Sequence, residues 1–573
     1  MKNRFSVKIV GESGQGINLM GEVLSKAFLE LGYYVFGYRE YPSLIKGGSA
    51  SYQLDISAQN INSSFKSSNV IIGLSRIALS QYLSDISDGG LIVHNVVKFQ
   101  KSEAENHILK SKNASEEFID TNSLLDKLNL NYRYANTFLV SLIWARLGFD
   151  VEILQEIFKE YFKERDDILE NNLTCINLGF EEGSNQSLVE HGLDKPEKKA
   201  NLEIMTGNEA IARSAIACGV RAFYAYPMTP ASSILEYLAN NAINTGMIVK
   251  QAEDEITAAQ MTLGSMFMGT RAMTATSGGG FDLMTETISL AGMTETPFVC
   301  VLAQRPGPAT GLPTWTQAGD LNLAIFAGHG EFPRCVLACS DLESCHRLTQ
   351  QAFNIAEYFQ IPVIVLTEKH IAESYFTKDT NFENLPIIRN LVEGKALEKL
   401  SPNDRYQFTD SGVSKRWVIG ASKATFLANS DEHSEDGSVT EDASLAQQMY
   451  EKRMKKYTGL LKVIPEPTLF GKTSGEFLLI GWGSVKLSVL DAINFADKNV
   501  SYLHLEVLHP LDIAKLSNIM GRFKKYIAIE QNYLGQMSKI LEMELKISFT
   551  DKWLKYDGRP FFVDEVIKYI NKL

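Results

Sequence analysis

The sequence lacks the residues that hold most metals and redox clusters in proteins. Its 573 residues contain six cysteines, none in a C-x-x-C pair, and no spacing matches a zinc or iron–sulfur ligand set. Cys218, Cys300 and Cys335 lie in or beside apolar segments, where a buried structural thiol is the simpler interpretation. No metal site is therefore expected in this chain.

Net positive charge and long apolar runs are also missing. The formal net charge is −12, which argues against nonspecific binding of nucleic acid or of an anionic membrane. No apolar run approaches the roughly 18 residues that a membrane-spanning helix needs. The N-terminus, MKNRFSVKIVGESGQG, leads straight into a strand, without the apolar core of a signal peptide. We expect a cytoplasmic protein.

The length requires several domains, because 573 residues exceed what one hydrophobic core supports. Alternating strand and helix patterns predict an α/β fold in three places. A charged linker and a long Asp-, Asn-, Ser- and Lys-rich stretch, whose NSDEHSEDGSVTED part should bury little surface, separate them. The expected divisions are an α/β domain at 1–185, a linker at 186–201, a second α/β domain at 202–375, an extended connecting segment at 376–470 and a third α/β domain at 471–573.

The first domain opens with a strand, a glycine turn and a helix, which predicts a Rossmann-like unit. Gly14, Gln15 and Gly16 belong to GESGQG, at a helix start where backbone N–H groups attract phosphate. The glycine spacing is not that of a full dinucleotide fingerprint, so a plain tight turn is equally open. Lys46, beside Gly47 and Gly48, suits a phosphate or an acidic partner, or is simply solvated.

The segment from 226 to 320 carries the most chemistry. Short apolar strands alternate there with polar, glycine-interrupted turns that open helices near residues 229, 253, 278 and 315. Such turns build sites at the ends of parallel strands. The segment contains a carboxylate-rich helix start, a Ser-Gly-Gly-Gly helix start and an arginine followed by a Gly/Pro/Thr-rich loop. It resembles half of an active site.

Each candidate also has a structural explanation. Glu253 and Glu255 stand in the first turn of a helix, where carboxylates are stabilised by the helix dipole without any ligand. Arg305 follows a strand and suits a carboxylate ligand, but a structural ion pair is the alternative. Thr229 and Thr314 offer hydroxyl groups in similarly placed loops, although Thr229 could be only a helix N-cap.

Several motifs taken together resemble one family. GESGQG, EYPSLIKGG, GNEAIA, YPMTP, EDEITAA, TATSGGGFDLM, RPGPATGLPT, AGHGEFPR, DEHSEDG, EKRMKK, GWGSVK and EQNYLGQ follow one another along nearly the whole chain. In this order and spacing they resemble the alpha subunit of 2-oxoacid:ferredoxin oxidoreductases, in the form with a gamma domain fused ahead of the alpha part. The resemblance implies a Rossmann-like gamma domain, a pyrimidine-binding domain of the thiamine diphosphate fold and a transketolase C-terminal-like domain.

The resemblance also implies an activity and roles for residues. The reaction would be oxidative decarboxylation of a 2-oxoacid, with 2-oxoglutarate favoured, that uses thiamine diphosphate and coenzyme A and passes electrons to ferredoxin. Glu255 best fits the glutamate that hydrogen-bonds the aminopyrimidine ring, and Glu253 is the second choice. Arg305 would hold the substrate carboxylate. The substrate pocket would be lined by Tyr226, Thr229 and Thr314, and coenzyme A would be contacted by Gly14, Gln15, Gly16 and Lys46.

Some parts of such an enzyme are not in this sequence. No GDG with a distal Asn pair is present to hold the Mg²⁺ of the diphosphate. The resemblance places that site and a 4Fe–4S cluster in a beta subunit, and implies a dimer of alpha–beta heterodimers. The isolated chain is therefore expected to be inactive.

The sequence departs from the family pattern at a few positions. Ser13, Lys46, Gly279 and Ala309 replace a usual glycine, arginine, proline and serine. These changes bear on the substrate and on coenzyme A contacts more than on the fold. Two alternatives remain: a subunit of a non-redox thiamine diphosphate enzyme, and a non-catalytic scaffold for the beta chain.

Overall fold

The computed structural model describes residues 3–44, 47–197 and 201–573, and these form two compact units. The first unit contains residues 3–205 of that set together with 373–381 and 562–572. The second contains residues 206–372 and 382–561. The five-part division expected from the sequence stays a prediction, although the chain does return to the first unit at 373–381 and again near its end.

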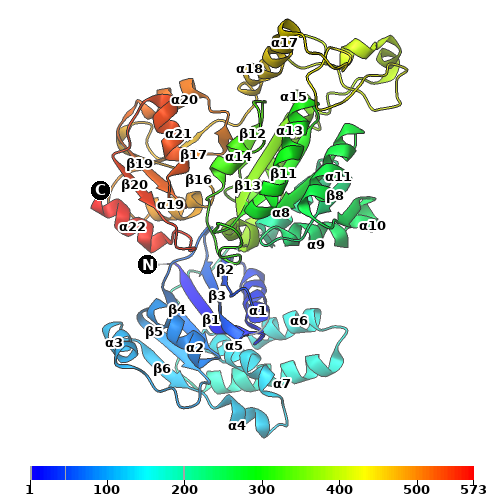
Figure 1. Cartoon of the computed structure of the whole chain (residues 1–573). Coiled ribbons are helices and arrows are strands. Elements are labelled where there is room, and N and C mark those ends of the chain that lie inside the picture. The colour runs from blue at the N-terminus through cyan, green and yellow to red at the C-terminus, as the bar shows by residue number, and fades with distance from the viewer. Residues whose placement is uncertain (1–2, 45–46, 198–200) are drawn as a thin grey trace. The chain divides into compact units, whose positions relative to one another are not determined.

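The first unit is built on an eight-stranded sheet, of which β1 to β6 are blue in Figure 1. Its order is β6-β5-β4-β1-β3-β2-β14-β7. The first four strands are parallel, whereas β3, β2 and β14 pair antiparallel. The strands are β1 (Phe5–Ser13), β2 (Tyr34–Glu40), β3 (Gly47–Ser57), β4 (Ser68–Gly73), β5 (Ile86–His94), β6 (Ser115–Phe118), β7 (Leu202–Thr206) and β14 (Tyr375–Asp379).

Helices cover both faces of this sheet. One large core packs β1, β3 and β4 against α1, α5, α6 and α7, and a smaller core packs the other face against α2 and α3. The predicted alternation of strands and helices is confirmed, but the sequence pattern did not identify β3. The helices are α1 (Ile17–Glu30), α2 (Arg76–Tyr82), α3 (Glu103–Ser111), α4 (Thr121–Asp126), α5 (Ala135–Arg146), α6 (Val151–Tyr161), α7 (Asp166–Ser184) and α22 (Val563–Lys572).

The second unit contains two further sheets. The larger has the order β18-β12-β13-β11-β10-β8-β9 and is parallel except for β18. Its strands are β8 (Ala222–Ala225), β9 (Ile248–Gln251), β10 (Ala272–Thr276), β11 (Phe298–Gln304), β12 (Cys335–Ala338), β13 (Pro362–Glu368) and β18 (Val507–His509). Its helices are α8 (Gly207–Ala217), α9 (Ser232–Asn240), α10 (Ala242–Thr245), α11 (Glu255–Phe267), α12 (Gly278–Leu283), α13 (Thr285–Met293), α14 (Leu321–Phe326), α15 (Leu342–Phe359) and α16 (Lys369–Glu373).

The smaller sheet has the order β15-β17-β16-β19-β20. One continuous core joins it to the larger sheet. Its strands are β15 (Thr468–Phe470), β16 (Gly475–Trp482), β17 (Ser501–Leu505), β19 (Phe523–Glu530) and β20 (Asp551–Leu554). Its helices are α19 (Val485–Ile493), α20 (Ile513–Met520) and α21 (Gln536–Leu545).

The helix expected near Trp315 is not formed. The chain from 305 to 320 is irregular, and α14 begins only at Leu321. Backbone groups of this stretch bond to distant parts of the chain instead: Thr316 N–H donates to the Gly558 carbonyl and Ala318 N–H to the Gln531 carbonyl. Tertiary contacts therefore override the local pattern here.

The connecting segment is folded more closely than its composition suggests. Helices α17 (Ala443–Met454) and α18 (Lys456–Leu460) end it, and His433 in the acidic stretch is buried. Lys452 and Lys456 place their ammonium groups 2.5 and 2.7 Å from the buried Glu295 carboxylate. Within the acidic stretch itself (429–442) only His433 and Gly437 are buried, which agrees with the expectation that it buries little surface. Hydrogen-bonded turns hold it in place.

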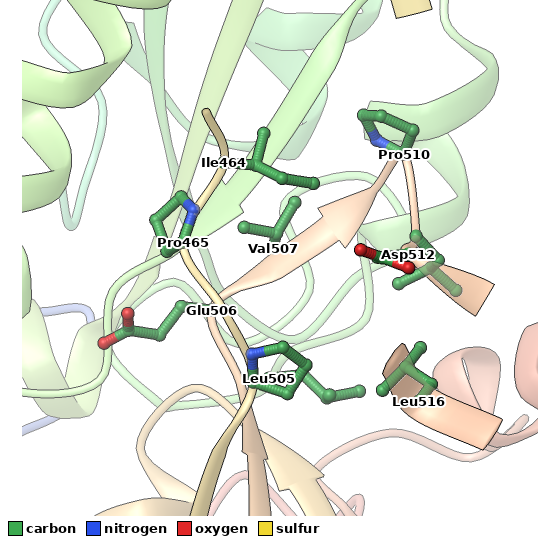
Figure 2. Close-up of a pocket in the computed structure, with 10 residues that line it drawn as sticks. Ile464, Pro465, Leu505, Glu506, Val507, Pro510, Asp512 and Leu516 are labelled. Carbon is green, nitrogen blue, oxygen red and sulfur yellow. The ribbon is translucent and has the colours of Figure 1, made fainter. Parts of the chain in front are cut away.

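A small cavity lies beside the turn that follows β17. Figure 2 shows its lining, which includes Ile464, Pro465, Val507 and Leu516. Its volume of about 20 Å³ is enough for a single water molecule. The cavity is lined by none of the residues that the sequence analysis singled out, so it belongs to the packing of the unit.

Candidate active site

Four neighbouring strands of the larger sheet bring the predicted motifs together. Strands β11, β10, β8 and β9 are adjacent and parallel, so their carboxyl ends lie at the same edge, where α/β sheets bind ligands. Each motif follows one of these strands: RPGPATGLPT after β11, TSGGG after β10, YPMTP after β8 and EDEITAA after β9.

The three carboxylates at the start of α11 have different surroundings. Asp254 is the N-cap, and its side chain accepts a hydrogen bond from Thr257 N–H at 2.7 Å. Glu253 is exposed, whereas Glu255 is 5% exposed, and its buried Oε1 has no hydrogen-bond partner among the described residues. An isolated buried acceptor is costly, so a helix-dipole explanation accounts for Asp254 but not for Glu255.

Glycine at position 280 leaves room for the Glu255 carboxylate. A Cβ atom added to Gly280 would lie 2.7 Å from Glu255 Cγ and Oε1, and it would also overlap Thr276 Oγ1. Gly279, in contrast, has nothing within 4 Å of its Cβ position. Ser277, just before α12, has a buried hydroxyl that finds no partner in the described part of the chain. Near the carboxyl end of β10, the side chains of Glu255 and Ser277 therefore leave polar atoms available for a ligand. The backbone at Gly280 lies close to the Glu255 side chain.

Arg305 and Thr229 are in direct contact. Arg305 Nη1 donates to the Thr229 carbonyl oxygen at 2.7 Å. Partial burial lowers the pKa of Arg305, and Asp320 opposes this shift. Thr229 is not a helix N-cap, because α9 begins at Ser232 with Ala231 at its N-cap. The two residues that the sequence predicted for substrate binding thus lie together.

The other two predicted substrate residues lie nearby in the chain. Thr314 is buried in the loop that follows Arg305, and Tyr226 is 40% exposed directly after β8. Their roles stay predictions.

Asp320 is a further ionisable residue at this edge, and the sequence analysis did not single it out. Its N–H donates to Gln304 Oε1 at 2.9 Å, and Gly278 approaches its carboxylate so closely that an added Cβ would lie 2.8 Å from Oδ2. Burial raises its pKa to about 6, with Asp282 adding to the shift and Arg305 opposing it. The only signal in the sequence was its place at the end of the loop that Arg305 begins.

The glycine turn of the first unit lines a large cavity. Gly14, Gln15 and Gly16 border a space of about 760 Å³ together with Tyr132, Tyr134 and Asn136. This volume lies in the range of small-molecule sites.

The turn itself is held by its neighbours. Gln15 Oε1 accepts from Glu12 N–H at 2.7 Å, and Asn136 Nδ2 donates to the Gln15 carbonyl at 2.9 Å. Gly16 has a φ of 75° at the N-cap of α1, a backbone conformation that favours glycine. Lys46 lies outside the described residues.

Neither a metal site nor a membrane-spanning helix is found in the part of the chain that the structure describes. No group of three His, Cys, Asp or Glu side chains there could hold a metal ion. No helix there is long and apolar enough to cross a bilayer. All six cysteines are free and buried.

The residues of the second unit fit part of a thiamine diphosphate site. The aminopyrimidine ring offers polar hydrogens, and Glu255 offers a buried oxygen that has no partner. The glycine at 280 keeps this carboxylate in a cradle that a side chain would fill. The site in this chain is therefore suited to the pyrimidine part of the cofactor.

Comparison with known proteins identifies related families and relatives. Residues 213–452 match the thiamine diphosphate-binding family of pyruvate flavodoxin/ferredoxin oxidoreductases, and residues 6–182 match the pyruvate ferredoxin/flavodoxin oxidoreductase family. A 2-oxoacid:ferredoxin oxidoreductase subunit alpha from Sulfolobus is 32% identical over 100% of this chain and 97% of its own. The 2-oxoglutarate oxidoreductase subunit KorA of Mycobacterium tuberculosis is 26% identical over 98% of this chain and 90% of its own.

A solved structure has the same fold over the whole length. The 2-oxoglutarate:ferredoxin oxidoreductase of Magnetococcus marinus, solved with 2-oxoglutarate, coenzyme A and succinyl-CoA bound, matches with a TM-score of 0.92 and 28% identity over 100% of both chains. The fold class expected from the sequence is confirmed. With full-length relatives at about 30% identity and the predicted motifs on one sheet edge, the chain belongs to the alpha subunits of 2-oxoacid:ferredoxin oxidoreductases.

Proposed function

We propose that this subunit, together with a beta subunit, oxidatively decarboxylates a 2-oxoacid. Coenzyme A would receive the acyl group, carbon dioxide would leave, and the electrons would pass to ferredoxin. The observation that carries the proposal is the buried, unpartnered Oε1 of Glu255 on the same sheet edge as Arg305 and Thr229.

Glu255 would hold the cofactor by accepting a hydrogen bond from the aminopyrimidine ring. The bound thiamine diphosphate supplies the carbanion chemistry, and the protein supplies its position and electrostatic surroundings. Glu253, the second choice from the sequence, is exposed and accepts from Thr257 Oγ1 at 3.3 Å. Its exposure makes it a poorer partner than Glu255 for a buried ring.

Arg305 would bind the carboxylate of the 2-oxoacid. A guanidinium group matches a carboxylate through parallel hydrogen bonds, and the bond to the Thr229 carbonyl fixes one of its nitrogens. Tyr226, Thr229 and Thr314 would line the substrate pocket. Asp320, whose pKa is about 6, would weaken the attraction for the substrate once it ionises.

Coenzyme A would bind in the cavity of the first unit. Gly14, Gln15 and Gly16 stand at the start of α1, where the free N–H groups of a helix attract phosphate. The cavity of about 760 Å³ is large enough for part of such a nucleotide. Lys46 would add a positive charge.

The remaining chemistry would come from partners. We infer that a beta subunit supplies the Mg²⁺ and diphosphate site and a 4Fe–4S cluster, that ferredoxin accepts the electrons, and that two alpha–beta pairs form the enzyme. A cytoplasmic location stays a prediction.

We favour 2-oxoglutarate as the substrate. Two of the compared proteins, from Mycobacterium tuberculosis and Magnetococcus marinus, are named for that acid. Pyruvate, for which both matching families are named, is the competing substrate.

The test is to coexpress the chain with a cluster-bearing beta subunit and to assay a panel of 2-oxoacids. We expect viologen reduction that requires both a 2-oxoacid and coenzyme A, fastest with 2-oxoglutarate. An assembled complex that reduces the dye with none of the acids would favour a scaffold role instead, and turnover of a 2-oxoacid without dye reduction would favour a non-redox enzyme.

A further inference from the structure

The loop that follows Arg305 is hydrogen-bonded to segments that follow β19 and β20. These strands belong to the smaller sheet of the second unit, which we call the third sheet. We call residues 306–322 the arginine loop; its last two residues are the first two of α14. Ala318 N–H donates to the Gln531 carbonyl at 2.8 Å, and Asn532 Nδ2 donates back to the Ala318 carbonyl at 3.1 Å. Gln536 Nε2 donates to the Gly319 carbonyl at 2.6 Å. Two adjacent residues of the loop thus have backbone groups bonded to one short motif, EQNYLGQ.

Contacts on either side extend this attachment. Asn322 N–H donates to Gln536 Oε1 at 2.9 Å, so the amide of Gln536 binds the loop with both of its ends. Thr316 N–H donates to the Gly558 carbonyl at 3.1 Å. The Arg559 guanidinium lies 3.3 Å from the ring centre of Trp315, within cation–π range.

The side chains that hold the loop are themselves fixed. Glu530 is 2% exposed, and its carboxylate accepts from Asn532 Nδ2, from two backbone N–H groups at the start of α21 and from Trp482 Nε1, at 2.8–3.2 Å. Asn532 Oδ1 accepts from the Gln536 N–H at 3.1 Å. A carboxylate with four donors does not reorient easily, so Asn532 and Gln536 are preorganised.

The topology explains why these groups are available. The chain passes from β16 to β17 on one side of β16 and later returns to β19 on the other side. The crevice beyond the carboxyl ends of two such strands is where open α/β sheets bind ligands. In this chain, segment 316–322 occupies that position through the hydrogen bonds described above. The third sheet therefore binds part of the chain itself at its switch point.

The far end of the arginine loop returns to its beginning. Asp320 N–H donates to Gln304 Oε1 at 2.9 Å, and Gln304, 1% exposed, directly precedes Arg305. A displacement at residues 318–319 would therefore be passed through the Asp320–Gln304 hydrogen bond to the end of β11 that carries Arg305.

We propose that Asn532 and Gln536 are positioning residues for substrate binding by Arg305. They act by fixing the arginine loop and not by contact with the substrate or the cofactor. The inference rests on the proposed role of Arg305. Through these two residues the third sheet would contribute to substrate recognition.

The test uses the alpha–beta complex with Gln536→Met and Gln536→Glu. Methionine removes both hydrogen bonds at similar volume, whereas glutamate retains the acceptor for Asn322 N–H and places an oxygen against the Gly319 carbonyl. Because methionine loses two hydrogen bonds, we expect KM for the 2-oxoacid to rise about tenfold with Met. Glutamate loses one bond but adds repulsion between its oxygen and the Gly319 carbonyl, so the rise should be larger with Glu. The kcat should change less than about threefold, and KM for coenzyme A should stay constant.

Hydrogen exchange of the peptide covering residues 306–322 gives a readout that needs no turnover. Its exchange should accelerate at least about tenfold in both variants, and other peptides should be unchanged. Gln448→Met is the matched control, because Gln448 is exposed and its amide donates to Ser444 in its own helix. It should leave KM and exchange as in the wild type.

Two results would overturn the positioning role. One is an unchanged exchange rate for the arginine loop in both Gln536 variants. The other is a lower Tm and lower kcat with an unaltered KM for the 2-oxoacid, which would mean general destabilisation. A wild-type complex that turns over no 2-oxoacid would instead refute the proposed function, and the exchange data would still show whether Gln536 holds the loop.

Discussion

Gly280→Ala is the substitution that most sharply probes the surroundings of Glu255. A Cβ at this position would lie 2.7 Å from Glu255 Cγ, whereas carbon atoms in contact are ordinarily at least 3.5 Å apart. Either the Glu255 carboxylate or α12 must therefore move by roughly 1 Å. Overpacking of this kind costs about 1–3 kcal/mol of folding free energy.

The effect on catalysis should exceed the effect on stability. A displacement of about 1 Å in a positioned group can cost on the order of a hundredfold in rate. We expect the Gly280→Ala complex to assemble, to lose about a hundredfold in kcat and to need more thiamine diphosphate for half-maximal activity. The assay is dye reduction by the alpha–beta complex at increasing cofactor concentration.

Gly279→Ala is the matched control, one residue away. Its Cβ would meet nothing within 4 Å. We expect it to retain most of the activity. Full activity in Gly280→Ala, or an equal loss in both variants, would show that the reasoning about the Glu255 cradle is wrong.

Three further substitutions have distinct expected results. Lys452→Met should lower the free energy of unfolding by about 3 kcal/mol in urea denaturation, because it removes one partner of the buried Glu295 carboxylate. Gly16→Ala should raise KM for coenzyme A about tenfold without changing KM for the 2-oxoacid, because its Cβ would overlap Asn136 Nδ2 and φ is positive. In the wild type, KM for the 2-oxoacid should rise as the pH increases through about 6, because above its pKa the Asp320 carboxylate is charged and offsets the charge of Arg305. Asp320→Asn should abolish this rise.

Each of these three predictions has a control variant or a result that would contradict it. Lys515→Met removes an exposed ammonium group and should leave the urea midpoint unchanged. Gly89→Ala has the same sign of φ as Gly16 but open space around it, so it should not affect KM for coenzyme A. A KM for the 2-oxoacid that falls as the pH rises through 6 in the wild type would contradict the role given to Asp320.

The sequence predicted the clustering of the site because of one simple rule. Motifs that follow adjacent parallel strands meet at one edge, and β8, β10 and β11 each precede such a motif. The contact between Arg305 and Thr229 follows from that rule, although 76 residues separate them.

The choice between Glu253 and Glu255 could not be derived from helix-dipole reasoning. That reasoning treats all first-turn carboxylates alike, whereas burial depends on the residue at which the helix begins. Asp254 is the N-cap, and this turns Glu255 inward and leaves Glu253 exposed. The motif resemblance pointed to Glu255 without giving this physical reason.

The irregular loop near Trp315 and the ordered acidic stretch were beyond local pattern reasoning. The first depends on partners more than 200 residues away, such as Gln531 for Ala318. The second depends on turns that a composition does not specify, for example the Ser434 hydroxyl bonded to Asp436 at 2.6 Å. Asp320 was missed for a similar reason, since its burial arises from the tertiary fold.

The most direct test of the central claim is the activity of the alpha–beta complex with Glu255→Gln. This substitution keeps the size of the side chain and removes its charge. If Glu255 is the cofactor's buried carboxylate partner, the complex should assemble normally and lose at least about a hundredfold in 2-oxoacid- and coenzyme A-dependent dye reduction. An assembled Glu255→Gln complex with full activity would contradict the account.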